Sequence, residues 1–261
     1  MNRPESKFVE PRVNRRPRSA VQAATAAARR VAARERDAHL NDDLQERAAQ
    51  IAPYLTKRFG LHFRGRILEI GAGAAWLSAE LSKLPGVVEI IATDLSGRRL
   101  KEEAPRVFAR VGAREDKITR IAGDLHELDF PASHFDFVVC ASVLNRTVNI
   151  GETLREARRV LKPGGWFVAV REPVKPWLKF QSQETSEARV RSGRRLYSRD
   201  DYERFFAAAG LEVEFKRVSL SSGMKFFFNQ MFNGLTHARY ALLARKPARP
   251  ANVPKPSRKK P

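Results

Sequence analysis

The stretch RILEIGAGAAWLSAEL, residues 66–81, decides how this chain folds. Residues 67–70 form a mostly apolar run, which is typical of a parallel strand that is covered on both faces. Gly71 and Gly73 follow it, and because neither has a Cβ, the backbone can turn sharply there and approach a ligand closely. Apolar residues then recur at helical spacing over 76–81, and the free N–H groups at the start of that helix favour an anionic or polar ligand.

A second buried strand follows and ends in an acid. Residues 87–93 are rich in Val and Ile, and Asp94 comes next, 21 residues after Gly73. An acid at the tip of the second strand of such a unit can accept hydrogen bonds from both ribose hydroxyls of a nucleoside. The turn departs from the dinucleotide pattern G-x-G-x-x-G, because Trp76 stands where the third glycine belongs.

The turn resembles the first motif of class I S-adenosylmethionine (SAM)-dependent methyltransferases, in which an acid and a hydrophobic residue precede G-x-G-x-G. Glu69, Gly71 and Gly73 match this motif, while Ala75 replaces the last glycine. The resemblance extends over about residues 50–248, and LKPGG is its most specific later piece. It implies an α/β fold with a Rossmann-like, seven-stranded, mostly parallel sheet, helices on both faces and a terminal antiparallel strand pair.

The resemblance also implies that SAM is the cofactor and which residues would bind it. Asp124 would accept the exocyclic amine of adenine, and Leu125 would lie against the ring. The predicted cofactor-binding residues are Glu69, Gly71, Ala72, Gly73, Asp94, Leu95, Asp124, Leu125 and Ala141.

The acceptor side is less defined than the cofactor side. Methyl transfer needs a general base only if the nucleophile must lose a proton, and the candidates for that role are Glu172 and His126. Asn145, Arg146 and Arg171 are candidates for binding the acceptor, since they follow strands at the carboxyl edge of the sheet and arginine suits an anion. A structural or surface role stays open for each of them.

The remaining elements are expected from periodicity and capping residues. Strands are predicted at 118–124, 137–141, 166–170, 211–218 and 240–247, and helices at 38–59, 98–111, 150–161 and 198–210. The domain plan is a basic extension at 1–37, disordered or helical, a methyltransferase domain at 38–247 and a basic disordered tail at 248–261. Residues 172–199 are predicted to form an insertion that covers the substrate.

The composition of the chain bears on its cellular location and on whether it can hold disulfides or a metal. The chain has 261 residues and a single cysteine, Cys140, which excludes an internal disulfide framework and a cysteine-rich metal site. No metal site is predicted. The sequence shows neither a membrane-spanning stretch nor a secretory signal, so a cytoplasmic location is expected.

The net charge of +20 lies mainly outside the predicted cofactor half. Residues 171–261 carry 20 Lys and Arg against 8 Asp and Glu, whereas residues 61–170 carry 16 against 14. Basic flanks suit nucleic acid, anionic lipid or a phosphorylated substrate, but they are also common in proteins with basic tails. Nucleic acid is not favoured, because aromatic and basic residues do not interleave.

The aromatic stretch at 224–232 has several possible roles. It can wall a substrate pocket, touch lipid, pack against the sheet or form a homo-oligomer contact. The favoured function is methyl transfer to a small molecule, aromatic or lipophilic. A methyltransferase of RNA or protein and a non-catalytic binding or assembly protein remain alternatives, and an NAD-dependent dehydrogenase is a weaker one because of Trp76.

Overall fold

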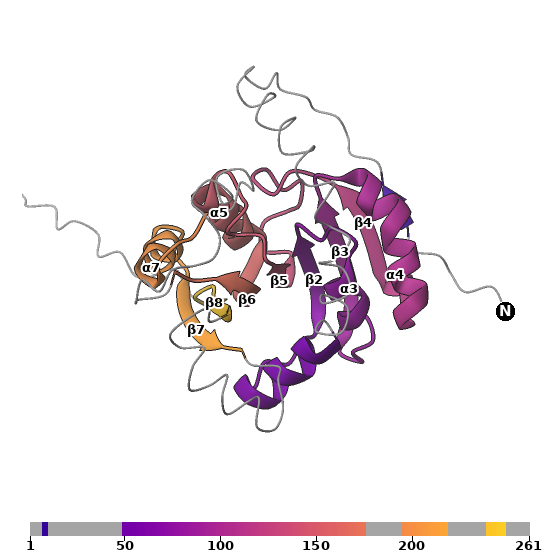
Figure 1. The fold of residues 1–261 in the computed structure, drawn as a ribbon, viewed down its shortest axis with the longest axis horizontal. Coiled ribbons are helices and arrows are strands. Elements are labelled where there is room, and N and C mark those ends of the chain that lie inside the picture. The colour runs from indigo at the N-terminus through magenta and orange to yellow at the C-terminus, as the bar shows by residue number, and fades with distance from the viewer. Residues whose placement is uncertain (1–6, 10–48, 176–194, 219–238, 249–261) are drawn as a thin grey trace, which may run out of the picture.

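The computed structural model describes residues 7–9, 49–175, 195–218 and 239–248, which form a mixed sheet with helices on both faces (Figure 1). The strands are β1 Lys7–Val9, β2 Gly65–Ile70, β3 Val87–Asp94, β4 Ile118–Ala122, β5 Phe135–Ala141, β6 Leu161–Pro173, β7 Glu212–Arg217 and β8 Arg239–Arg245. The helical segments are residues 49–59, α3 Trp76–Leu81, the π-helical turn η1 Arg99–Glu103, α4 Ala104–Val111, the 3-10 turn η2 Glu115–Lys117, α5 Ile150–Val160 and α7 Arg199–Ala208.

Within the described residues the strand order is β1-β4-β3-β2-β5-β6-β8-β7. Neighbouring strands from β1 to β6 are parallel, whereas β8 runs antiparallel to both β6 and β7. The predicted fold class, a mostly parallel sheet that ends in an antiparallel pair, is therefore confirmed.

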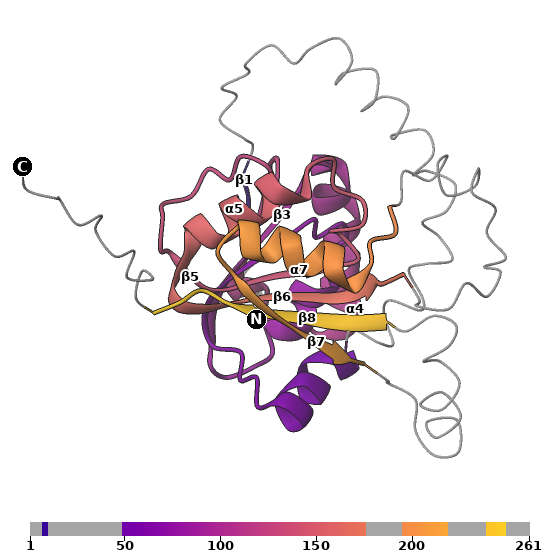
Figure 2. The same ribbon diagram turned by 90° about the vertical axis from the view of Figure 1, so that its left-hand side faces the viewer.

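Two apolar layers explain why the central strands are apolar on both faces. Residues 49–59, α3 and α4 cover one face, while α5 and α7 cover the other (Figure 2). In β2, Ile67 packs in the first layer and Leu68 in the second, so successive side chains enter opposite layers. Cys140 is fully buried in the second layer, as a small apolar residue would be.

The predicted number of strands is wrong by one. The sequence predicts seven strands, and in the described residues β1 adds an eighth at the edge beside β4. Phe8 packs against the first apolar layer, and the Lys101 ammonium lies 5.9 Å from the centre of its ring. A strand of three residues has no detectable periodicity of its own, so it forms because it pairs with the β4 edge and Phe8 packs on the first apolar layer.

Strand β6 is longer than predicted at both ends. It begins at Leu161, directly after α5, and it includes Glu172 and Pro173, which the sequence analysis placed in the substrate-covering insertion. These two residues pair with Tyr240 and Arg239 of β8. The long-range pairing with β8 therefore extends a strand whose local sequence, with its prolines and charges, predicts an end.

Several predicted features lie outside the described residues. These are most of the N-terminal extension, residues 176–194 of the insertion, the aromatic stretch 224–232 and the tail from residue 249. None of the helices in the described ranges is both long enough and apolar enough to cross a membrane.

Helix α7 begins with a capping box formed by Ser198 and Asp201. The Ser198 hydroxyl accepts a hydrogen bond from the Asp201 N–H (3.1 Å), and the Asp201 carboxylate accepts one from the Ser198 N–H (2.9 Å). The helix buries Tyr202 and Phe206 completely in the second apolar layer. The cap thus fixes where an essential core helix starts.

We expect Ser198→Ala to lower the free energy of unfolding by about 1 kcal/mol, because it removes this acceptor. Urea denaturation followed by circular dichroism measures the change. Ser198→Asn is the matched control, since asparagine also caps helices well. Equal stabilities of the alanine and asparagine variants would contradict the prediction.

Candidate active site

A cavity of about 310 Å³ lies at the carboxyl ends of the central strands. Strand β2 stands between β3 and β5, so the chain leaves it toward one side of the sheet and returns on the other. Such a reversal of strand order is where open α/β sheets bind ligands. The residues that line the cavity are Ile51, Glu69, Gly71–Ala74, Trp76, Leu77, Asp94, Leu95, Arg99, Leu125, His126, Ala141–Val143, Arg146–Val148, Val170 and Arg171.

The glycine turn after β2 forms the floor of the cavity. Gly71 and Gly73 both have positive φ angles, +64° and +57°. A Cβ at Gly71 would lie 2.7 Å from a Val143 methyl carbon, and one at Gly73 would lie 3.1 Å from the Arg99 guanidinium. Both positions therefore have a left-handed backbone that favours glycine, and at Gly71 a side chain would also collide with Val143.

Asp94 at the tip of β3 holds this turn in place. One carboxylate oxygen accepts the Gly73 N–H (2.8 Å), and the other accepts the Ser96 N–H (2.7 Å). Each carboxylate oxygen has a second lone pair. Asp94 can consequently hold the turn and still accept two hydrogen bonds from a ligand in the cavity.

Glu69 is a buried carboxylate in the wall of the cavity, only 3% exposed. It accepts hydrogen bonds from the Ser78 N–H (2.8 Å) and the Ser78 hydroxyl. Burial raises its pKa to about 7, although these bonds oppose the shift. Because the Ser78 N–H is one of the first in α3, Glu69 accepts one of the donors at this helix start.

His126 is braced between two loops at the edge of the cavity. Its Nδ1 lies 2.7 Å from an Asp124 oxygen, and its Nε2 lies 2.8 Å from the Thr147 hydroxyl. The Asn149 N–H also points to Nε2 (3.3 Å), so Nε2 is the acceptor and Nδ1 carries the proton. This arrangement connects the loop after β4 with the loop after β5, while Asp124 lies behind the histidine and does not line the cavity.

Glu172 performs a similar task for the loop after β5. It is fully buried, and its carboxylate accepts the N–H groups of Val143 (2.8 Å), Leu144 (3.2 Å) and Asn145 (3.3 Å). Burial raises its pKa to about 7, against the effect of these three bonds. Neither Glu172 nor Asn145 lines the cavity, so their contacts place them as supports of the loop that presents Arg146.

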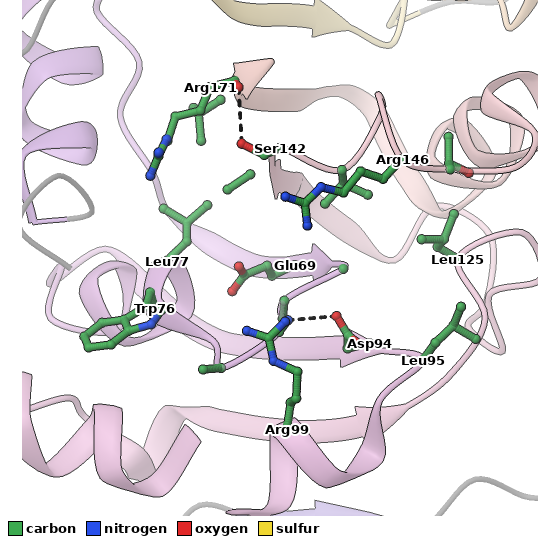
Figure 3. A pocket seen from close by; sticks show the side chains of 18 of the residues that line it. Glu69, Trp76, Leu77, Asp94, Leu95, Arg99, Leu125, Ser142, Arg146 and Arg171 are labelled. Carbon is green, nitrogen blue, oxygen red and sulfur yellow. Dashed lines mark hydrogen bonds between the residues drawn. The ribbon is translucent and has the colours of Figure 1, made fainter. Parts of the chain in front are cut away.

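Two residues with left-handed backbone face each other across the ends of β5 and β6. Ser142 and Arg171 have φ angles of +55° and +61°. The Ser142 N–H donates to the Val170 carbonyl (3.0 Å), and its hydroxyl donates to the Arg171 carbonyl (3.2 Å) (Figure 3). Strained backbone of this kind concentrates at functional sites, where surrounding contacts hold it.

The cavity has two chemically different ends (Figure 3). Leu95 and Leu125 lie at one end, beside Asp94, whereas Trp76 and Leu77 lie at the other. The side chains of Arg99 and Arg146 reach toward the middle.

The known proteins that resemble this chain identify its family. Residues 68–169 match the model of a methyltransferase domain. The ubiquinone/menaquinone biosynthesis C-methyltransferase of Ectopseudomonas oleovorans is 34% identical over 117 residues, which are 42% of this chain and 68% of that protein. The chain belongs to the class I SAM-dependent methyltransferase family.

The C-methyltransferase of the same name from Pseudomonas fluorescens (strain SBW25) is also 34% identical to this chain over 117 residues. The match covers 42% of this chain and 45% of that relative, so the chain spans about half the length of the curated relatives matched first. The fold matches Haemonchus contortus phosphoethanolamine N-methyltransferase 2 in complex with SAM, with a TM-score of 0.60 and 18% identity over 76% of this chain and 52% of that one. The cofactor of this methyltransferase family is SAM.

The residues of this cavity fit SAM. The glycine turn lines the cavity with Gly71, Ala72 and Gly73, and Asp94 retains two lone pairs for ribose hydroxyls. Leu95 and Leu125 offer apolar surface for a purine. When bound, SAM supplies an electrophilic methyl group on a positively charged sulfur.

About half of the residues that line the cavity are predicted from the sequence. The predicted residues that line it are Glu69, Gly71, Ala72, Gly73, Asp94, Leu95, Leu125, His126, Ala141, Arg146 and Arg171. Asp124, Asn145 and Glu172 lie behind them. The sequence does not predict that Arg99, Trp76 and Ile51 line the cavity. Of these three, Trp76 had a signal in the sequence, because it begins the helix beside the glycine turn.

Proposed function

We propose that this chain transfers the methyl group of SAM to a small-molecule acceptor that carries an ionisable hydroxyl on an aromatic ring, and that the methyl group goes to a ring carbon of a quinol-type compound. The cavity at the glycine turn, with Asp94 at one end and arginines toward its middle, is the observation that supports the proposal most. The matched relatives are named as C-methyltransferases of ubiquinone and menaquinone biosynthesis, which supports the acceptor class.

The residues of the chain suit this reaction in a simple way. A ring carbon becomes nucleophilic when the hydroxyl beside it loses its proton to water, because the negative charge of the oxygen is shared with the ring. The guanidinium of Arg146, presented by the loop that Glu172 holds, can stabilise that oxygen by a charge-assisted hydrogen bond. A new carbon–carbon bond forms as the carbon–sulfur bond breaks, and the ring carbon then releases its proton to water.

The test incubates the full chain with methyl-labelled SAM and, separately, a short-chain 1,4-naphthoquinol, a simple phenol, RNA and a basic protein. Mass spectrometry and label counting identify the methylated product. We expect label on a ring carbon of the quinol. Label only on RNA or protein would overturn the small-molecule proposal, and bound SAM with no transfer to any acceptor would favour the non-catalytic alternative.

We expect Arg146→Gln to lower kcat/KM for the quinol about tenfold to a hundredfold, since it removes the charge next to the developing oxyanion. The affinity for SAM should change little. Arg155→Gln is the matched control, because Arg155 is an exposed arginine on α5. An unchanged kcat/KM in the Arg146 variant would remove the arginine from the proposed mechanism.

A further inference from the structure

Trp76 has a buried polar atom for which the protein offers no partner. It is the first residue of α3, the residue is 9% exposed, and it lines the cavity. Its indole Nε1–H is buried and makes no hydrogen bond within the described part of the chain. Buried donors without an acceptor are rare, because the cost of removing them from water is not compensated. A ligand in the cavity could provide the acceptor for this N–H.

The surroundings of Trp76 indicate what kind of ligand atom would bind there. An indole N–H can only donate. The Arg171 guanidinium lies on the same side of the cavity, and it too can only donate (Figure 3). The acids of the cavity, Asp94 and Glu69, accept N–H groups of the glycine turn and of α3. The Trp76 end therefore suits an acceptor group with negative charge.

SAM carries such a group at the end opposite its adenosine. Its adenosine matches the end of the cavity formed by Asp94, Leu95 and Leu125, so its carboxylate faces the other end. We propose that the indole N–H of Trp76 donates a hydrogen bond to the carboxylate of SAM and so selects the complete cofactor. This inference rests on the proposed use of SAM by this chain.

The test is calorimetric titration of the full chain and its Trp76→Phe variant with SAM and with decarboxylated SAM, which lacks only the carboxylate. Phenylalanine keeps an aromatic ring in the apolar layer but has no N–H. We expect the variant to bind SAM about tenfold more weakly than the wild type does. For decarboxylated SAM, the affinities of the variant and the wild type should agree within about twofold. Trp166→Phe is the matched control, because the Trp166 ring lies outside the cavity, 5.5 Å from the Arg245 guanidinium.

A second measurement observes the bond itself. In a ¹⁵N–¹H spectrum, the indole N–H resonance that disappears in Trp76→Phe should move downfield when SAM is added, and should not do so with decarboxylated SAM. If Trp76→Phe bound SAM and decarboxylated SAM more weakly by the same factor, the ring would act only by packing and the inference would be overturned. An unchanged affinity of the variant for SAM would also overturn it. If the wild type binds neither ligand, the proposed function itself fails and the inference falls with it.

Discussion

Replacing Asp94 by alanine is expected to weaken the binding of SAM and of S-adenosylhomocysteine by about 1–3 kcal/mol, or roughly fivefold to 150-fold. Two effects combine. The ribose hydroxyls lose their acceptor, and the N–H groups of Gly73 and Ser96 lose the carboxylate that holds the turn. Calorimetric titration of both ligands measures the loss.

Binding of a ligand that lacks one ribose hydroxyl distinguishes these two effects. The 2′-deoxyribose analogue of S-adenosylhomocysteine lacks one of the hydroxyls, so the Asp94 variant should lose less affinity for it than for the parent compound. Asp116→Ala is the matched control, because Asp116 is a surface carboxylate that pairs with Arg114 (3.1 Å) and does not line the cavity. Equal losses for both ligands would show that Asp94 supports the turn without binding the ribose.

Glu69→Gln is expected to change how the stability of the fold depends on pH. The pKa of Glu69 is raised by burial from 4.5 to about 7 in the folded chain. Between these values the folded state binds more protons than the unfolded state, so the free energy of unfolding contributed by Glu69 is fully present below about pH 4.5 and is lost as pH rises through about 7. A neutral glutamine has no such loss and keeps an oxygen for the Ser78 N–H.

The variant should therefore gain stability relative to the wild type by up to about 3 kcal/mol between about pH 5 and pH 8. Urea denaturation at the two pH values measures this gain. Glu203→Gln, which removes an exposed carboxylate paired with Arg199 on α7, is the matched control. A constant difference between wild type and the Glu69 variant across this range would contradict the raised pKa. Glu172 is present in all three proteins, so its own titration cancels in the comparison.

The local sequence was sufficient for the features that depend on neighbouring residues. The strand, glycine turn and helix over 66–81 follow from apolar spacing and from two glycines, and β3 ends at Asp94 as its pattern predicts. The capping box of α7 is equally local, because Ser198 and Asp201 are three residues apart. Such features were predictable since each rests on backbone geometry within a few positions.

Features that depend on distant parts of the chain were not predictable in this way. The roles of Glu172 and Asp124 illustrate this, because each acid resembled a site residue by its place after a strand. Glu172 supports a loop 27–29 residues earlier in the chain, and Asp124 holds His126, which lines the cavity. Which oxygen meets which N–H depends on how two strands lie side by side, and no local pattern records that.

The sequence by itself thus determined the family, the parallel sheet and the cofactor turn, because apolar periodicity and glycine geometry act locally. Only the tertiary structure decided that Arg99, Trp76 and Ile51 line the same cavity as Asp94, and that Lys7–Val9 completes the sheet at its edge. These residues come from separate segments, and what places them together is the burial of shared apolar layers, to which every segment contributes and which no single segment specifies.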